Sequence, residues 1–124
     1  MEVSIKFAFV TRFCILVLGL LRFLHARTEP ASRLTVKFEN ERVRVLELLL
    51  KPGQSERQHS HPQYVLYPLT DYKVRNTSAD GTVRVFERKA GEVFWGDPIT
   101  HGGENVGTTD VHAIIVELKP TSHP

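Results

Sequence analysis

The sequence has almost no cysteine, because Cys14 is the only one among 124 residues. A single cysteine cannot form a disulfide within the chain or a cysteine-based metal site, so both are excluded. A predominance of one charge is also missing, since 16 Lys and Arg residues stand against 14 Asp and Glu residues. This balance gives no indication of nucleic acid or an anionic surface as a partner. The sequence also lacks a nucleophile–base pair, a phosphate-binding loop and paired catalytic carboxylates.

Long apolar runs are scarce, and the longest is FCILVLGLL at residues 13–21. It follows a basic start and precedes a small residue, Ala26, which is the pattern of a secretory signal. We therefore expect residues 1–26 to form a signal peptide and residues 27–124 to form one exported domain, periplasmic or secreted. An uncleaved membrane anchor and a misassigned start are the alternatives. A spanning helix of about 20 residues would have to include Arg12.

After residue 27 the sequence consists of short segments that alternate between apolar and polar residues and are rich in β-branched side chains. This period-2 pattern is typical of half-buried strands, and the Pro-Gly and Asp-Gly pairs between segments mark turns. No segment shows the sustained 3.6-residue period of a helix. The sequence therefore predicts an all-β sandwich or barrel. The expected strand segments are 33–40, 41–50, 64–70, 71–76, 82–89, 90–98, 101–107 and 111–119.

Two of the six histidines stand one residue apart in HSHPQY, at His59 and His61. In a strand, residues i and i+2 point to the same face, so both imidazoles should project together. Imidazole is the commonest neutral metal ligand, and a catalytic metal site needs about three protein ligands. His101, in a Gly- and Pro-rich segment, is the candidate for the third. On its own, an H-x-H pair is weak evidence, because most histidines are surface or satisfied core residues.

The segments GQSERQHSH and GEVFWGDPITHGGEN together resemble the two motifs of the cupin superfamily. Gly53 and Gly91 match the motif glycines, and the three histidines match three of the motif's four metal ligands. The resemblance covers residues 33–119. It implies a jelly-roll barrel, the double-stranded β-helix of the cupin type, that holds one divalent metal ion and pairs as a homodimer. Fe²⁺ is the favoured ion, while Ni²⁺, Zn²⁺, Mn²⁺ and Cu²⁺ stay open, because imidazole suits several of these metals.

The sequence departs from the cupin pattern at the fourth ligand, a glutamate that three or four intervening residues should separate from His61. Val65 and Leu66 occupy those positions, and neither can bind a metal. Gln63 and Tyr64 are therefore the candidates for a fourth ligand or for orienting a substrate. Trp95 and Asn105, from the second motif, are expected to line the pocket. The catalytic residues themselves are not identified by this pattern.

Three functions remain compatible with the sequence. The first is an exported three-histidine metal-binding cupin, in its enzymatic version a mononuclear, iron-type dioxygenase that acts on a small molecule. The second is the same barrel as a module that binds a metal or small ligand without turnover. The third is a metal-free barrel that works through dimerisation, with the segment 33–40 exchanged between protomers. The fold does not choose among them, because it supports many unrelated activities.

Overall fold

The computed structural model describes residues 33–121, and this part of the chain consists of nine β-strands without a helix. The leader predicted at residues 1–26 lies outside the described residues and stays a prediction. Between residues 33 and 121, no helix offers the length and apolarity needed to cross a membrane. The strands are β1 (Leu34–Glu39), β2 (Val43–Leu50), β3 (His59–His61), β4 (Tyr64–Pro68), β5 (Tyr72–Ser78), β6 (Val83–Arg88), β7 (Phe94–Gly96), β8 (Ile99–Asn105) and β9 (Val111–Leu118).

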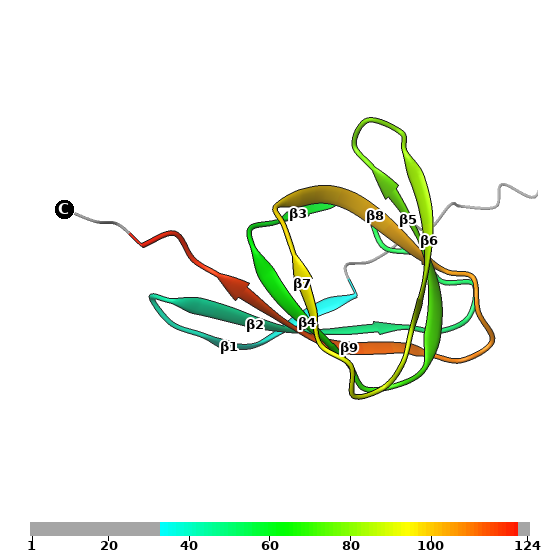
Figure 1. The fold of residues 1–124 in the computed structure, drawn as a ribbon, viewed down its shortest axis with the longest axis horizontal. Helices are drawn as coiled ribbons and strands as arrows, with labels where there is room; N and C mark the ends of the chain where they lie inside the picture. The colour runs from blue at the N-terminus through cyan, green and yellow to red at the C-terminus, as the bar shows by residue number, and fades with distance from the viewer. Residues whose placement is uncertain (1–32, 122–124) are drawn as a thin grey trace, which may run out of the picture.

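The strands form two antiparallel sheets that face each other (Figure 1). One sheet has the order β1-β2-β9-β4-β7 and the other the order β3-β8-β5-β6. Several spatial neighbours, such as β2 and β9, are far apart in the sequence, as in a double-sheet jelly roll. The expected all-β barrel of the double-stranded β-helix type is therefore confirmed.

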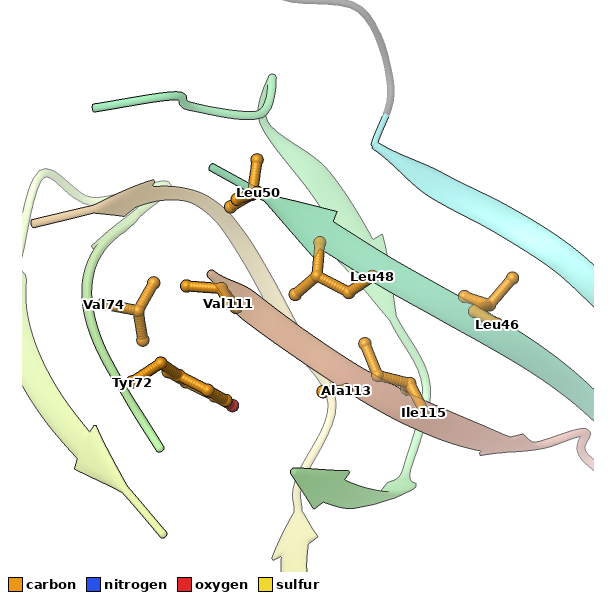
Figure 2. Close-up of a cluster of buried hydrophobic side chains, with 8 residues drawn as sticks. All are labelled: Leu46, Leu48, Leu50, Tyr72, Val74, Val111, Ala113 and Ile115. Atoms are coloured by element: carbon orange, nitrogen blue, oxygen red, sulfur yellow. The ribbon is translucent and has the colours of Figure 1, made fainter. Parts of the chain in front are cut away.

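The core lies between the sheets and is built mainly from the inward faces of β2 and β9 (Figure 2). Their registers place apolar partners directly opposite one another, as in the pairs Leu48↔Ala113 and Leu50↔Val111. Tyr72 from β5 packs against this row from the facing sheet. Alternation in the sequence produces this arrangement, because every second residue of an antiparallel strand faces the core. The full cluster is Leu46, Leu48, Leu50, Tyr72, Val74, Val111, Ala113 and Ile115.

The two glycines that match the cupin motifs occupy turns with left-handed backbone. Gly53 has φ +79° and Gly91 has φ +84°, a region that side chains with a Cβ rarely adopt. The Gly53 N–H donates to the carbonyl of Asn105 at 2.9 Å, and the Gly91 N–H donates to the carbonyl of Pro68 at 3.0 Å. Each glycine thus connects a turn to a strand distant in sequence.

Pro68 lies at an uncommon position, since proline within a sheet is normally confined to edge strands, the first residue of a strand, or bulges. The strand β4 is instead an interior strand, flanked by β9 and β7. The proline is tolerated because it is the last residue of β4, and β7 pairs only with residues 64–66. The missing N–H of Pro68 therefore interrupts no pairing with β7.

Candidate metal centre

The three predicted histidines lie together on the inner side of the barrel, where β3 pairs with β8. His59 is directly opposite His101 in the antiparallel register, and His61 is two residues further along β3. One ring nitrogen of each histidine lies within 4.8 Å of the others. The ring centroids of His61 and His101 are 5.4 Å apart. The prediction that these residues share one face and meet across neighbouring strands is confirmed.

Hydrogen bonds at the Nδ1 atoms determine which ring nitrogen of His59 and of His61 carries the proton. His59 Nδ1 lies 2.8 Å from the carbonyl of Arg57, which can only accept, so Nδ1 carries the proton. His61 Nδ1 lies 2.6 Å from a carboxylate oxygen of Glu117 and donates to it. Both Nε2 atoms then carry a lone pair, and they face each other at 2.8 Å. When both rings are neutral, these lone pairs repel unless a cation lies beside them.

His101 completes this arrangement with an unpaired imidazole. Both of its ring nitrogens are buried and have no hydrogen-bond partner. Burial, together with the neighbouring His59 and His61, lowers the pKa of His101 to about 4, so the ring is neutral at physiological pH. Buried polar groups nearly always have a partner, and an unpaired one has a cost of about 1–3 kcal/mol. A ring nitrogen held neutral and unpaired is suited to coordinate a metal ion.

Glu117 supports this centre from β9. One carboxylate oxygen accepts from His61, and the other accepts from Arg44 Nε at 2.7 Å. Burial acts to raise the pKa of Glu117, but the hydrogen bonds from Arg44 and His61 outweigh it and lower the pKa. A carboxylate behind a ligating histidine fixes its ring and raises its basicity. Sequence reasoning missed Glu117, although an acidic residue in register with the buried Val111, Ala113 and Ile115 was a usable signal.

Glu56 is a second carboxylate that sequence reasoning missed. Its Oε1 lies 3.8 Å from His59 Nε2, and its Oε2 is buried without a hydrogen-bond partner. Strict alternation from His59 would place residue 56 on the opposite face. The ladder is irregular here, because Ser55 is opposite Glu104 while His59 is opposite His101. Four residue steps on one side are thus matched by three on the other, as in a β-bulge, which reverses the alternation.

The Glu56 carboxylate fits beside β8 because Gly103 of that strand has no side chain. A Cβ on Gly103 would lie 3.1 Å from Glu56 Oε1, closer than side chains normally approach. The Glu56 N–H donates to the carbonyl of Gly103 at 2.9 Å, which holds the residue beside the strand. Burial raises the pKa of Glu56 to about 7, against the opposing electrostatic effect of the neighbouring His59. The group therefore exchanges a proton near neutral pH.

The two candidates for the missing motif glutamate differ in position. Gln63 is exposed in the bend between β3 and β4, and its role stays a prediction. Tyr64 is half-buried, and its ring centroid lies 5.1 Å from that of His61. Gly96 makes room for this ring, because a Cβ there would overlap it. Burial raises the pKa of Tyr64, so its phenol remains protonated.

The expectation that Trp95 and Asn105 line the pocket is wrong for both residues. Trp95 is 57% exposed on the outer face of β7, because alternation in this short strand turns Phe94 and Gly96 inward instead. Asn105 is buried, but its amide donates to the carbonyls of Leu50 and Thr109 and its Oδ1 accepts from a backbone N–H. Asn105 therefore joins the ends of strands and has no free polar atom for a ligand.

A cavity of about 300 Å³ opens beside the histidines, within the range of small-molecule sites. His61, His101 and Glu56 form part of its wall, and the remainder comes from the inward faces of both sheets. The wall contains apolar residues such as Leu66 and Ile115 and also many polar ones, among them Asn76, Ser78 and Thr82. A small molecule in the cavity would therefore lie against two of the three histidines.

Comparisons with known proteins agree with this architecture. No protein-family model matches the sequence, and no curated protein matches it either. Solved structures do match. A cupin domain protein from Bordetella pertussis Tohama I is 26% identical with a TM-score of 0.66, over 74% of this chain and 97% of that one. An uncharacterised protein with a double-stranded β-helix domain from Klebsiella pneumoniae is 23% identical with a TM-score of 0.57, over 73% and 78%.

A third match lies further away in sequence. An RmlC-like cupin family protein from Methanocaldococcus jannaschii is 14% identical with a TM-score of 0.57, over 74% of this chain and 84% of that one. The fold and the histidine group thus define a small β-barrel with a candidate metal centre. The fold of the described residues is the double-stranded β-helix fold of the cupin superfamily.

Proposed function

We propose that this protein binds one divalent metal ion through His59, His61 and His101 and uses it to oxidise a small molecule held in the adjacent cavity. The observation that carries the proposal is the unpaired, buried and neutral imidazole of His101. The two Nε2 lone pairs of His59 and His61, which face each other at 2.8 Å, support it independently. Without a cation, the unpaired nitrogens of His101 and the facing lone pairs of His59 and His61 would both destabilise the fold, and no interaction would compensate for them.

Ferrous iron is the ion that we propose, and when bound it would supply the single-electron chemistry that O₂ activation requires. The chain itself orients the imidazoles through Arg57 and Glu117. A dioxygenase reaction incorporates both atoms of O₂ into the product, so it needs no further reductant. Nitrogen ligands suit several metals, and the identity of the ion is therefore part of what must be measured.

The test is metal analysis of protein produced anaerobically with sufficient iron, followed by oxygen uptake with a panel of thiols, diketones and flavonols. We expect about one metal ion per chain, because the three histidines form one site. Oxygen uptake should depend on the metal and be lost after treatment with a chelator. Metal binding without oxygen uptake would contradict the oxygenase and favour a module that only binds. Absence of metal after reloading with iron, zinc and nickel would contradict the centre itself.

We further propose that Glu56 supplies the carboxylate that the first cupin motif lacks. In cupins with a complete motif, the glutamate follows the histidine pair, whereas here Glu56 precedes it by three residues. Its support is structural, since Oε2 has no partner and Oε1 lies 3.8 Å from His59 Nε2. Its negative charge would balance half the charge of a divalent ion.

Glu56→Gln should lower the affinity for Zn²⁺, a redox-silent probe, by about tenfold or more. The metal-free variant should also lose a pH dependence. Because the pKa of Glu56 rises from 4.5 to about 7 in the fold, wild-type stability should fall as the pH rises across this interval. The decrease is on the order of 3 kcal/mol, and the variant should lack it.

Isothermal titration calorimetry and denaturant unfolding at several pH values would measure both effects. Glu104→Gln is the matched control, because Glu104 lies on the neighbouring strand and pairs with Arg75 at the surface. Unchanged Zn²⁺ affinity in Glu56→Gln would show that this carboxylate is not a ligand.

A further inference from the structure

The inward face of β6 carries an arginine that no acidic group neutralises. Arg88 is half-buried and lines the same cavity as His61 and His101. Between residues 33 and 121, no carboxylate lies within ion-pair distance of its guanidinium group, and no hydrogen bond to it is formed. The two acidic residues of the cavity wall are held elsewhere. Asp80 accepts from the Thr82 N–H at 2.9 Å, and Glu56 lies beside His59.

Two aromatic rings hold the guanidinium in place. Its Cζ lies 4.0 Å from the centroid of the Phe94 ring and 4.6 Å from that of the Phe86 ring. Such cation–π contacts fix the plane of the group but leave its N–H groups unused. A planar guanidinium with free N–H groups matches the two oxygens of a carboxylate. The stacking therefore orients Arg88 for an anion that the chain does not provide.

Polar and apolar neighbours extend this site into the cavity. Tyr72 pairs with Arg88 across the β5–β6 ladder, and the charge of Arg88 acts against the burial that raises the pKa of both Tyr72 and Tyr64. Both phenols line the cavity, and Tyr64 also contacts the ring of His61. The wall also offers apolar surface from residues such as Leu66, Phe86 and Ile115, together with further polar side chains such as Asn76 and Ser78. A suitable ligand therefore has one anionic end and a body with an apolar part that can pack against this surface.

We propose that the cavity binds a small carboxylate with an apolar body, whose carboxylate group is held by Arg88 through paired hydrogen bonds. The proposal names the substrate class for the proposed function. It rests on that function only for the contacts between the other end of the ligand and the histidines. The contact with Arg88 needs no metal. Arg84 also lines the cavity but is exposed, so it is the weaker candidate for the anion.

The test uses benzoate as the probe and benzamide as its neutral counterpart, titrated into metal-free and Zn²⁺-loaded full-length protein by calorimetry. We expect benzoate to bind about tenfold more tightly than benzamide to the metal-free protein, because hydrogen bonds between charged groups are the strong ones. Arg88→Met should remove this preference and leave benzamide binding unchanged. Arg88→Lys should retain only part of it, since lysine has charge but no planar fork. Arg42→Met, at an exposed turn, is the control and should behave like the wild type.

Each alternative result has a definite meaning. Equal binding of benzoate and benzamide, or an unchanged preference in both Arg88 variants, would overturn the proposal. Loss of the preference in Arg84→Met instead would place the anion at the cavity mouth and would also overturn it. Benzoate binding that requires Zn²⁺ and ignores Arg88 would put the carboxylate on the metal, supporting the proposed function but not this inference. Arg88-dependent binding of benzoate in a protein that takes up no metal would support this inference and contradict the proposed function.

Discussion

His101→Leu should abolish metal binding and at the same time stabilise the metal-free protein. Leucine has a similar size but no nitrogen, so it removes a ligand and also the two buried ring nitrogens that lack partners. Removing unpaired buried polar atoms should raise the free energy of unfolding of the metal-free protein by about 1–3 kcal/mol. The wild type should instead gain about 4 kcal/mol when the metal concentration is a thousand times its dissociation constant. The variant should gain nothing from metal.

Metal analysis and denaturant unfolding with and without Zn²⁺ measure these two effects separately. His112→Leu is the control, because His112 lies on β9 and pairs with Glu47 at 2.9 Å, away from the three histidines. That variant should keep full metal content. Wild-type metal content in His101→Leu would disprove the three-histidine centre. A metal-free His101→Leu protein less stable than the wild type would mean that the imidazole has a favourable partner after all.

Glu117→Ala should destabilise the fold and weaken metal binding together. Glu117 is 2% exposed and its carboxylate accepts hydrogen bonds from both His61 and Arg44, so its removal leaves a buried donor and a cation unpaired. Arg44 is 39% exposed at its side chain and can be partly rehydrated, which places the expected loss near the lower end for buried pairs, about 3 kcal/mol. Metal affinity should fall about 10- to 100-fold, because His61 loses the group that fixes its ring.

Chemical denaturation and Zn²⁺ titration of the same samples distinguish the two consequences. Glu117→Gln retains an oxygen that can accept from His61, so it should recover part of the metal affinity but less of the stability. Glu104→Ala is the control for loss of an ion pair, since its pair with Arg75 is exposed and should contribute less than about 1 kcal/mol. Full metal affinity in Glu117→Ala would show that Glu117 has only a structural role.

The fold and the histidine group could be predicted because both depend on alternation along single strands. Period-2 patterning assigns β2 and β9 their buried faces. The same rule puts His59 and His61 on one side, and cupin-like spacing identified His101 as their partner. The expectation for Trp95 was wrong because it came from the second motif and not from alternation, and a strand of three residues carries too little pattern to show which face is inward.

The sequence by itself determined the barrel class, the two motif glycines Gly53 and Gly91 and the three histidines, because these follow from local backbone preference and residue spacing. Only the tertiary structure decided what surrounds them. A ladder irregularity turns Glu56 inward, and strand order brings Glu117 from β9 to His61. Stacking between two rings leaves Arg88 without an acidic partner. These relations depend on register and on pairing between distant strands, which no local pattern specifies.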